Sequence, residues 1–355
     1  MKTSDAEQFI HDCKENQELL KNKNSCDKYD YLTAVACGAI GGIIDILFVG
    51  SASNSVLQKW SDRQVDNCVK KFAKLMGWNP SAAQRDNIRS AIGFLEKKYK
   101  VNYDQRHTVD VNGQFSMNTK NHHIMSLSHA PDVIGLFFSV LNQFTSTSSF
   151  ISEGKLITIR TESSFELQGG DFITKIFCGI VNWFGHIMSD VAGSSGSRGN
   201  NRRGTGIVIP FFELFQICNF GKFRVEKDKQ TFSTIAMRAF ESGYDLRYGL
   251  TMSIPVVITE LLIRFIWSLK QFFYYKRPLK ECVPISKNDS LRMMLLLGNG
   301  TLCIIDGVDS LRFGAGNMLC CFMRFNIIAW ARFISLVLRE ICIKIGLPNE
   351  IINEV

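Results

Sequence analysis

Residues 172–190 read FITKIFCGIVNWFGHIMSD, an apolar run that ends in a polar pair. His186 and Asp190 are four residues apart, which places both side chains on one face of an α-helix, one turn from each other. An imidazole and a carboxylate so arranged can share a metal ion. Alternatively, the carboxylate can accept a hydrogen bond from the imidazole and so orient it toward a metal. The run therefore predicts an apolar helix with two metal-ligand candidates at its end.

A loop rich in glycine, serine and arginine follows this helix. Residues 193–206 read GSSGSRGNNRRGTG and include Arg198, Arg202 and Arg203. Beside a metal, backbone N–H groups and guanidinium groups of such a loop can bind the phosphate of a substrate. A connector with solubilising charge explains the same composition equally well, so both interpretations stand.

A second polar cluster precedes the helix and holds three of the six histidines of the chain: His122, His123 and His129. Asp132 follows at the entrance of another apolar helix, where Pro131 suits the first turn. Hydrolytic metal centres use neutral imidazoles and carboxylates and keep an open position for water. We predict that His129 and His123, or alternatively His122, are ligands together with His186 and Asp190. Asp132 is the candidate general base.

The first apolar run, residues 31–50 (YLTAVACGAIGGIIDILFVG), has about the length needed to cross a bilayer, roughly 20 residues. Gly38 and Gly42 form a pair of small residues that lets another helix approach closely. Asp45 is the one charged residue of the run. Because an ionisable group inside an apolar helix is costly and faces a partner or a cavity, Asp45 joins the predicted ligands.

Charge and hydropathy divide the chain into five consecutive parts. These are a polar leader (1–31), a first apolar helix (32–55), a soluble helical hairpin (56–121), the metal-site core (122–218) and an apolar helical region (219–355). The alternation in residues 155–161 predicts one small β-hairpin, with residues 164–167 as the second strand. The sequence therefore predicts a mainly all-α, multi-helix bundle associated with a membrane.

Composition narrows the classes of partner and compartment. The net charge of +8 suits an anionic membrane surface or a nucleic acid, but no RNA-binding aromatic motif, zinc finger or clear helix-turn-helix is present. We therefore expect a lipid bilayer rather than a nucleic acid as the partner. The 11 cysteines include no C-x-x-C pair and lie largely in apolar runs, which predicts reduced thiols. Aromatic and basic residues at 274–280 are typical of the cytoplasmic side of a membrane.

These motifs together resemble the family of membrane-bound, metal-dependent hydrolases whose bacterial members are described as LexA-regulated inner-membrane proteins. The corresponding residues are Asp45 after Gly41-Gly42, His123 with Ser128-His129, Gly185-His186 with Asp190, and the run from Gly204 to Phe211. The sequence departs from the family in lacking a Pro before Asp45 and a second Asp nearby. The gap from His123 to His129 is also one residue longer.

The resemblance implies a bound divalent metal ion (Zn, Mn or Fe), a phosphate-containing or lipid-associated substrate, and a location in the bacterial inner (cytoplasmic) membrane. Two other interpretations fit the residues. One is a membrane protein without catalysis, such as a pore, an anchor or an assembly factor, whose intramembrane polar residues pair helices. The other is a soluble all-helical protein with unusually apolar helices. Bound metal separates the first interpretation from the second, and fractionation separates the third.

Overall fold

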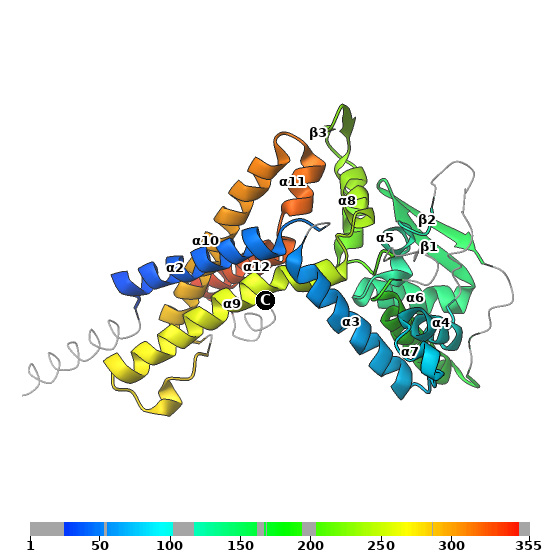
Figure 1. Ribbon diagram of the computed structural model, residues 1–355, viewed down its shortest axis with the longest axis horizontal. Helices are drawn as coiled ribbons and strands as arrows, with labels where there is room; N and C mark the ends of the chain where they lie inside the picture. The colour runs from blue at the N-terminus through cyan, green and yellow to red at the C-terminus, as the bar shows by residue number, and fades with distance from the viewer. Residues whose placement is uncertain are drawn as a thin grey trace, which may run out of the picture. The chain divides into compact units, whose positions relative to one another are not determined.

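The structure is a computed structural model of the 355-residue chain (Figure 1). It describes residues 25–52, 55–101, 117–161, 167, 169–193, 204–285 and 287–347. Helices dominate these residues, and the strands among them form two small antiparallel pairs, so the mainly all-α prediction is confirmed. The chain forms two compact units, each assembled from segments that are distant in the sequence. Unit 1 comprises Met1–Leu47, Met252–Val308 and Asn326–Val355, and unit 2 comprises Phe48–Thr251 and Asp309–Phe325. The five consecutive parts stay a prediction.

Unit 1 is built on long apolar helices. Its elements are α2 (Lys28–Ile44), most of η1 (Asp45–Val49), most of α9 (Leu246–Leu269), η6 (Lys270–Tyr274), η7 (Leu279–Glu281), most of α10 (Asp289–Gly314) and α12 (Ile327–Lys344). Three continuous helical stretches are long and apolar enough to cross a bilayer: Lys28–Val49, Leu246–Tyr274 and Asp289–Gly314. The helices α11 (Met318–Arg324) and α12 reach that length only as a bent pair. These helices indicate a membrane protein.

Glycines on α2 bring the helices of unit 1 into close contact, as the small-residue pair predicted. A Cβ atom on Gly38 would overlap the carbonyl of Gly298 in α10, and one on Gly42 would lie 2.7 Å from a methyl group of Ile305. Figure 1 shows α2, α9 and α10 grouped in this part of the molecule. Backbones that approach this closely gain dispersion contacts without relying on water, which is how helices associate in a bilayer.

Unit 2 combines shorter helices with the two hairpins. Its helices are α3 (Val56–Leu75), η2 (Ala82–Gln84), α4 (Ile88–Lys98), α5 (His122–Met125), η3 (Leu127–His129), α6 (Val133–Thr145), α7 (Phe172–Asp190), η5 (Phe212–Gln216), α8 (Phe232–Glu241) and α11. Its strands are β1 (Thr147–Ser152), β2 (Lys155–Arg160), β3 (Phe223–Val225) and β4 (Asp228–Gln230).

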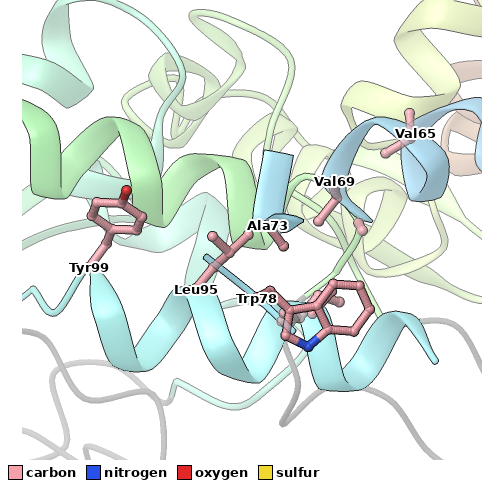
Figure 2. Close-up of a cluster of buried hydrophobic side chains, with 9 residues drawn as sticks. Val65, Val69, Ala73, Trp78, Leu95 and Tyr99 are labelled. Atoms are coloured by element: carbon pink, nitrogen blue, oxygen red, sulfur yellow. The ribbon is translucent and has the colours of Figure 1, made fainter. Parts of the chain in front are cut away.

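The helical hairpin predicted between residues 56 and 121 is formed by α3 and α4. Ser55 and Asn87 cap the two helices through side-chain oxygens that accept N–H bonds from Gln58 and Arg89. The apolar positions of both helices meet in one buried cluster (Figure 2): Val65, Val69, Ala73, Trp78, Ala91, Ile92, Leu95, Tyr99 and Ala192. Burying each large aliphatic side chain contributes about 1.5–3 kcal/mol, so this cluster fixes α4 against α3 and the end of α7.

The small β-hairpin exists, but its partner strand differs from the prediction. Strand β2 pairs with β1, which precedes it, in a register from Thr147 opposite Arg160 to Ser152 opposite Lys155. Glu153 and Gly154 form the turn with φ of +47° and +81°, the left-handed conformation that two-residue hairpin turns require. The predicted partner was residues 164–167, of which 164–166 lie outside the described residues. A second hairpin, β3–β4, was not predicted.

Candidate metal centre

Two segments of unit 2 supply the candidate ligands, and both are fixed by local sequence. The first is α5 with η3, which carry His122, His123 and His129. The second is the last turn of α7, which carries His186 and Asp190. Gly185 lets α7 lie against α4, because a Cβ atom there would overlap the ring of Tyr99. All five candidate side chains belong to residues that are 0% to 5% exposed.

The ligand atoms converge on one carboxylate oxygen. The Nε2 atoms of His186, His123 and His129 lie 3.2, 3.4 and 3.6 Å from Oδ2 of Asp190. Neighbouring donor atoms in a tetrahedron lie about 3.4 Å apart when each is bonded to its metal at about 2.1 Å. The three distances from Asp190 scatter around that value, and the potential ligand groups are His129 with His186 and Asp190, and His122 with His123 and His129.

Hydrogen bonds on the far side of two rings set the ring nitrogen that faces the centre. Nδ1 of His123 lies 2.8 Å from the carbonyl oxygen of Gly206, and Nδ1 of His186 lies 3.2 Å from that of Tyr99. A carbonyl accepts only, so each Nδ1 carries a proton, and Nε2 is the atom that faces Asp190 and presents a lone pair once it is deprotonated. Among the described residues, Nε2 of His123 and Oδ2 of Asp190 have no hydrogen-bond partner. Burying such atoms costs about 1–3 kcal/mol each, a cost that a bound ion would remove.

The protonation of the cluster suits metal binding. Burial, followed by the nearby His123, lowers the pKa of His129 well below the ordinary value of 6.5, which leaves a neutral imidazole at neutral pH. Burial opposes ionisation of Asp190, but His186 and His123 hold the pKa of its carboxyl well below 3.8. Burial acts to lower the pKa of His186, but the charge of Asp190 raises it. A metal entering the site therefore displaces a proton from His186.

The sequence left open whether His122 or His123 is the metal ligand, and the structure gives these two residues different contacts. His123 contacts Asp190 and has its tautomer fixed by Gly206. The ring of His122 lies 3.9 Å from that of His123 between centroids, and His122 forms a second potential ligand group with His123 and His129. His129 also belongs to the group with His186 and Asp190. These contacts favour His123 as the ligand and place His122 beside it.

Asp132 lies at the start of α6 and serves as its N-cap. Its Oδ1 accepts hydrogen bonds from the backbone N–H groups of Ile134 at 2.9 Å and Gly135 at 3.0 Å. Its Oδ2 accepts one from Phe211 at 2.7 Å. Both oxygens are thus used to join the segment after His129 to the turn at Phe211. These contacts support a positioning role, and the general-base role stays a prediction.

Glu213 is a buried acid that the sequence reasoning missed. Burial, followed by the nearby charge of Asp132, raises its pKa to about 8. It lies in η5, and at neutral pH it holds a proton that it can release near neutrality. The signal in the sequence was a lone glutamate inside the apolar run IVIPFFELF, residues 207–215.

Asp45 is placed in unit 1, whereas the converging ligand atoms all belong to unit 2. Its carboxylate accepts a hydrogen bond of 2.6 Å from Nδ2 of Asn326, the N-cap of α12. The backbone N–H of Asn326 donates to Asp306, which also accepts from the indole of Trp330 at 2.7 Å. Within unit 1, Asp45 thus pairs helices, and its role as a ligand stays a prediction.

The predicted substrate residues Arg198, Arg202 and Arg203 lie outside the described residues. The two flanks of their loop are described, and Arg247 holds both. Its guanidinium donates to the carbonyl oxygens of Ala192 at 3.2 Å and Gly204 at 2.7 Å, and it pairs with Asp245. Asp245 in turn accepts a hydrogen bond from the backbone N–H of Gly206, the residue whose carbonyl orients His123.

Comparison with family models, curated proteins and solved structures finds no match for this chain. The likeness to membrane-bound, metal-dependent hydrolases therefore stays an expectation from scattered motifs. The positions of the ligand atoms in unit 2 are the main evidence for function.

Proposed function

We propose that this protein is a membrane-anchored, metal-dependent hydrolase whose ion is held by His123, His129, His186 and Asp190. The observation that carries the proposal is the convergence of three imidazole Nε2 atoms, at 3.2–3.6 Å, on Oδ2 of Asp190. The three long apolar helices support attachment to a membrane. A bacterial inner membrane and a phosphate-containing or lipid-associated substrate come from the family resemblance and are part of the proposal.

The donor set suits a first-row divalent ion, either Zn, Mn or Fe. Three nitrogens and one carboxylate oxygen are borderline ligands that suit each of the three ions. Such an ion supplies a Lewis acid and lowers the pKa of a bound water toward neutrality. The remaining tasks fall to the protein. Asp190 balances charge, the carbonyls of Gly206 and Tyr99 orient two rings, and Glu213 holds a proton near neutral pH.

Metal analysis of purified full-length protein in detergent or nanodiscs tests the proposal. We expect about one equivalent of metal per chain, and we expect His186→Ala and Asp190→Ala to weaken binding by at least about 10–100-fold, since ligand loss exceeds the loss of an outer partner. Asp171→Ala is the matched control. It removes an exposed aspartate that caps the other end of α7, so metal should be retained. Absence of stoichiometric metal, or equal loss in the control, contradicts the proposal.

A specific observation favours a second candidate function, a non-catalytic membrane protein with a structural metal. Four protein donors buried from solvent resemble closed structural sites, whereas catalytic sites keep a position for water. Two measurements separate the candidates. Hydrolysis of chromogenic phosphomonoesters or phosphodiesters that is lost in Asp190→Ala supports the hydrolase. A metal-loaded protein that hydrolyses none of these esters and shows no inner-sphere water after Mn substitution supports the structural role.

A further inference from the structure

The helix α6 exposes its apolar side and buries its polar side, the reverse of a surface helix in a water-soluble protein. Its exposed side includes Val133, Phe137, Leu141 and Phe144, and its sequence contains no charged residue. Its buried side carries Ser139, Asn142 and Gln143. A surface helix in water shows the opposite arrangement, with the apolar stripe turned to the core.

The helix α7 shows the same inversion over most of its length. Apart from Thr174, its exposed side chains are apolar and follow a helical spacing: Phe172, Ile173, Phe177, Ile180, Val181 and Phe184. Its buried residues include His186, Ser189 and Asp190. Across the two helices, the exposed apolar side chains keep 36% to 77% of their accessible surface. That pattern suits surroundings that are themselves apolar.

The two helices lie side by side and are joined through their polar sides. Nε2 of Gln143 donates to the carbonyl of Gly179 at 3.0 Å, and Nδ2 of Asn182 donates to Oε1 of Gln143 at 3.2 Å. The rings of Phe144 and Phe172 lie 5.5 Å apart between centroids, so the exposed stripes meet. We call these exposed apolar side chains of α6 and α7 the α6–α7 face.

We propose that the α6–α7 face is embedded in one leaflet of a lipid bilayer. The occupant is lipid because unit 2 continues directly from helices that are long and apolar enough to span, at Leu47–Phe48, Thr251–Met252 and Val308–Asp309. A bilayer is therefore always within reach of this unit. The 13 residues of α6 extend about 20 Å, too short for a hydrocarbon core of about 30 Å. The face consequently lies within one leaflet.

This placement has a consequence for the candidate metal centre. His129 lies four positions before the first residue of α6, and His186 and Asp190 lie in the last turn of α7. A face lying among acyl chains would bring the ligand-bearing ends of both helices near the headgroups. The proposed bilayer contact does not depend on whether metal is bound, since it rests on the exposed side chains alone.

Site-specific photocrosslinking tests the proposal on the full chain in nanodiscs of phosphatidylcholine and phosphatidylglycerol. A benzophenone amino acid replaces Phe137 or Phe177, which are exposed, so the substitutions leave the fold intact. The matched control carries it in place of Lys97, an exposed residue of α4 in the same unit. After irradiation, intact-mass spectrometry should show several-fold more lipid adduct at Phe137 and Phe177 than at Lys97. Equal lipid yields, or adducts to a second copy of the chain at the α6–α7 face, would overturn it.

Discussion

At the scale of single residues, Asp190 organises the candidate metal centre. One of its oxygens faces three imidazoles, and it is completely buried. The His-x-x-x-Asp spacing predicted the contact between His186 and Asp190, because i and i+4 residues of a helix must be neighbours. The approach of His123 and His129 to the same oxygen depends on tertiary packing of α5 and η3 against α7. Sequence spacing offered those residues as candidates but contained no information on their distance.

The two adjacent histidines offer a direct comparison. We expect His123→Gln to weaken metal binding by at least about 10-fold, because it removes a donor that faces Asp190 and an oriented ring. His122→Gln is the matched change and should have a smaller effect, since His122 makes no ion-pair contact with Asp190 among the described residues. Titration with Zn²⁺ monitored by a competing chelator measures both. A larger loss in His122→Gln would move the site toward the group of His122, His123 and His129.

Two buried histidines should lower the stability of the metal-free protein as the pH drops below 6.5. Burial lowers the pKa values of His122 and His129 in the folded state. Below pH 6.5 the unfolded chain therefore binds protons at these residues that the folded chain does not bind. His186 acts in the opposite sense. Its pKa is raised, so its stabilisation is complete at low pH and is lost as the pH rises through its folded value. Glu213 acts in the same sense as His186, because its folded pKa of about 8 keeps its carboxyl protonated where the unfolded carboxyl is ionised. The comparison is therefore made in Glu213→Gln protein, in which two histidines with a lowered pKa oppose one with a raised pKa. In that protein the Tm should be lower at pH 5.5 than at pH 6.5.

Thermal unfolding of chelator-treated Glu213→Gln protein in detergent, followed by circular dichroism, measures this dependence. His129→Gln provides the control, because it removes one of the two histidines whose pKa is lowered. The Tm of this variant should therefore fall less on acidification. A Tm that is constant or rises on acidification across this interval contradicts the assigned protonation states.

At the scale of elements, the periodic helices were predictable, whereas the role of a polar group at a helix end was not. The run 172–190 and the hairpin of α3 and α4 follow from apolar spacing and capping residues. Strand β1 was missed because TSSFIS, residues 147–152, lacks alternation and is buried almost throughout. Asp132 illustrates a different limit. An aspartate before an apolar helix is a common N-cap, yet beside histidines it also has the chemistry of a general base.

Substitutions of Asp132 separate these two roles. Asp132→Ala should destabilise unit 2 by about 0.5–2 kcal/mol, the usual cost of losing an N-cap. Asp132→Asn keeps an oxygen that accepts from Ile134 and Gly135 and should cost less. Both variants should retain metal. If Asp132→Asn abolishes hydrolysis of a phosphoester while stability and metal content are normal, the residue is a general base after all.

At the scale of the whole molecule, the sequence predicted apolar helices but could not predict how they group. The two units interleave along the chain, with α2, α9 and α10 contributing to unit 1 although some 200 residues separate α2 from α9. Such long-range pairing depends on complementary surfaces, for example the glycines of α2 against α10. Composition along the chain records the helices but not their partners.

Counting candidate spans leads to a prediction of sidedness. Two of them, Lys28–Val49 and Leu246–Tyr274, separate the N-terminus from the loop at residues 275–288, so both should lie on one side of the membrane. The loop carries Lys276, Arg277, Lys280 and Lys287, and basic loops remain cytoplasmic. Reporter fusions at the N-terminus and within the loop should both report the cytoplasm. Reporters on opposite sides would mean that one of the two helices does not span.

The hydrogen bonds from Arg247 to the carbonyl oxygens of Ala192 and Gly204 have a consequence for protein engineering. One guanidinium closes the base of the arginine-containing loop, so the positions of its two ends do not depend on what joins them. Lengthening such a closed segment costs only about 0.6 kcal/mol for each doubling of its length. We therefore expect an insertion between Gly193 and Gly204, such as a tag, a fluorophore or a foreign recognition sequence, to leave Ala192 and Gly204 in place.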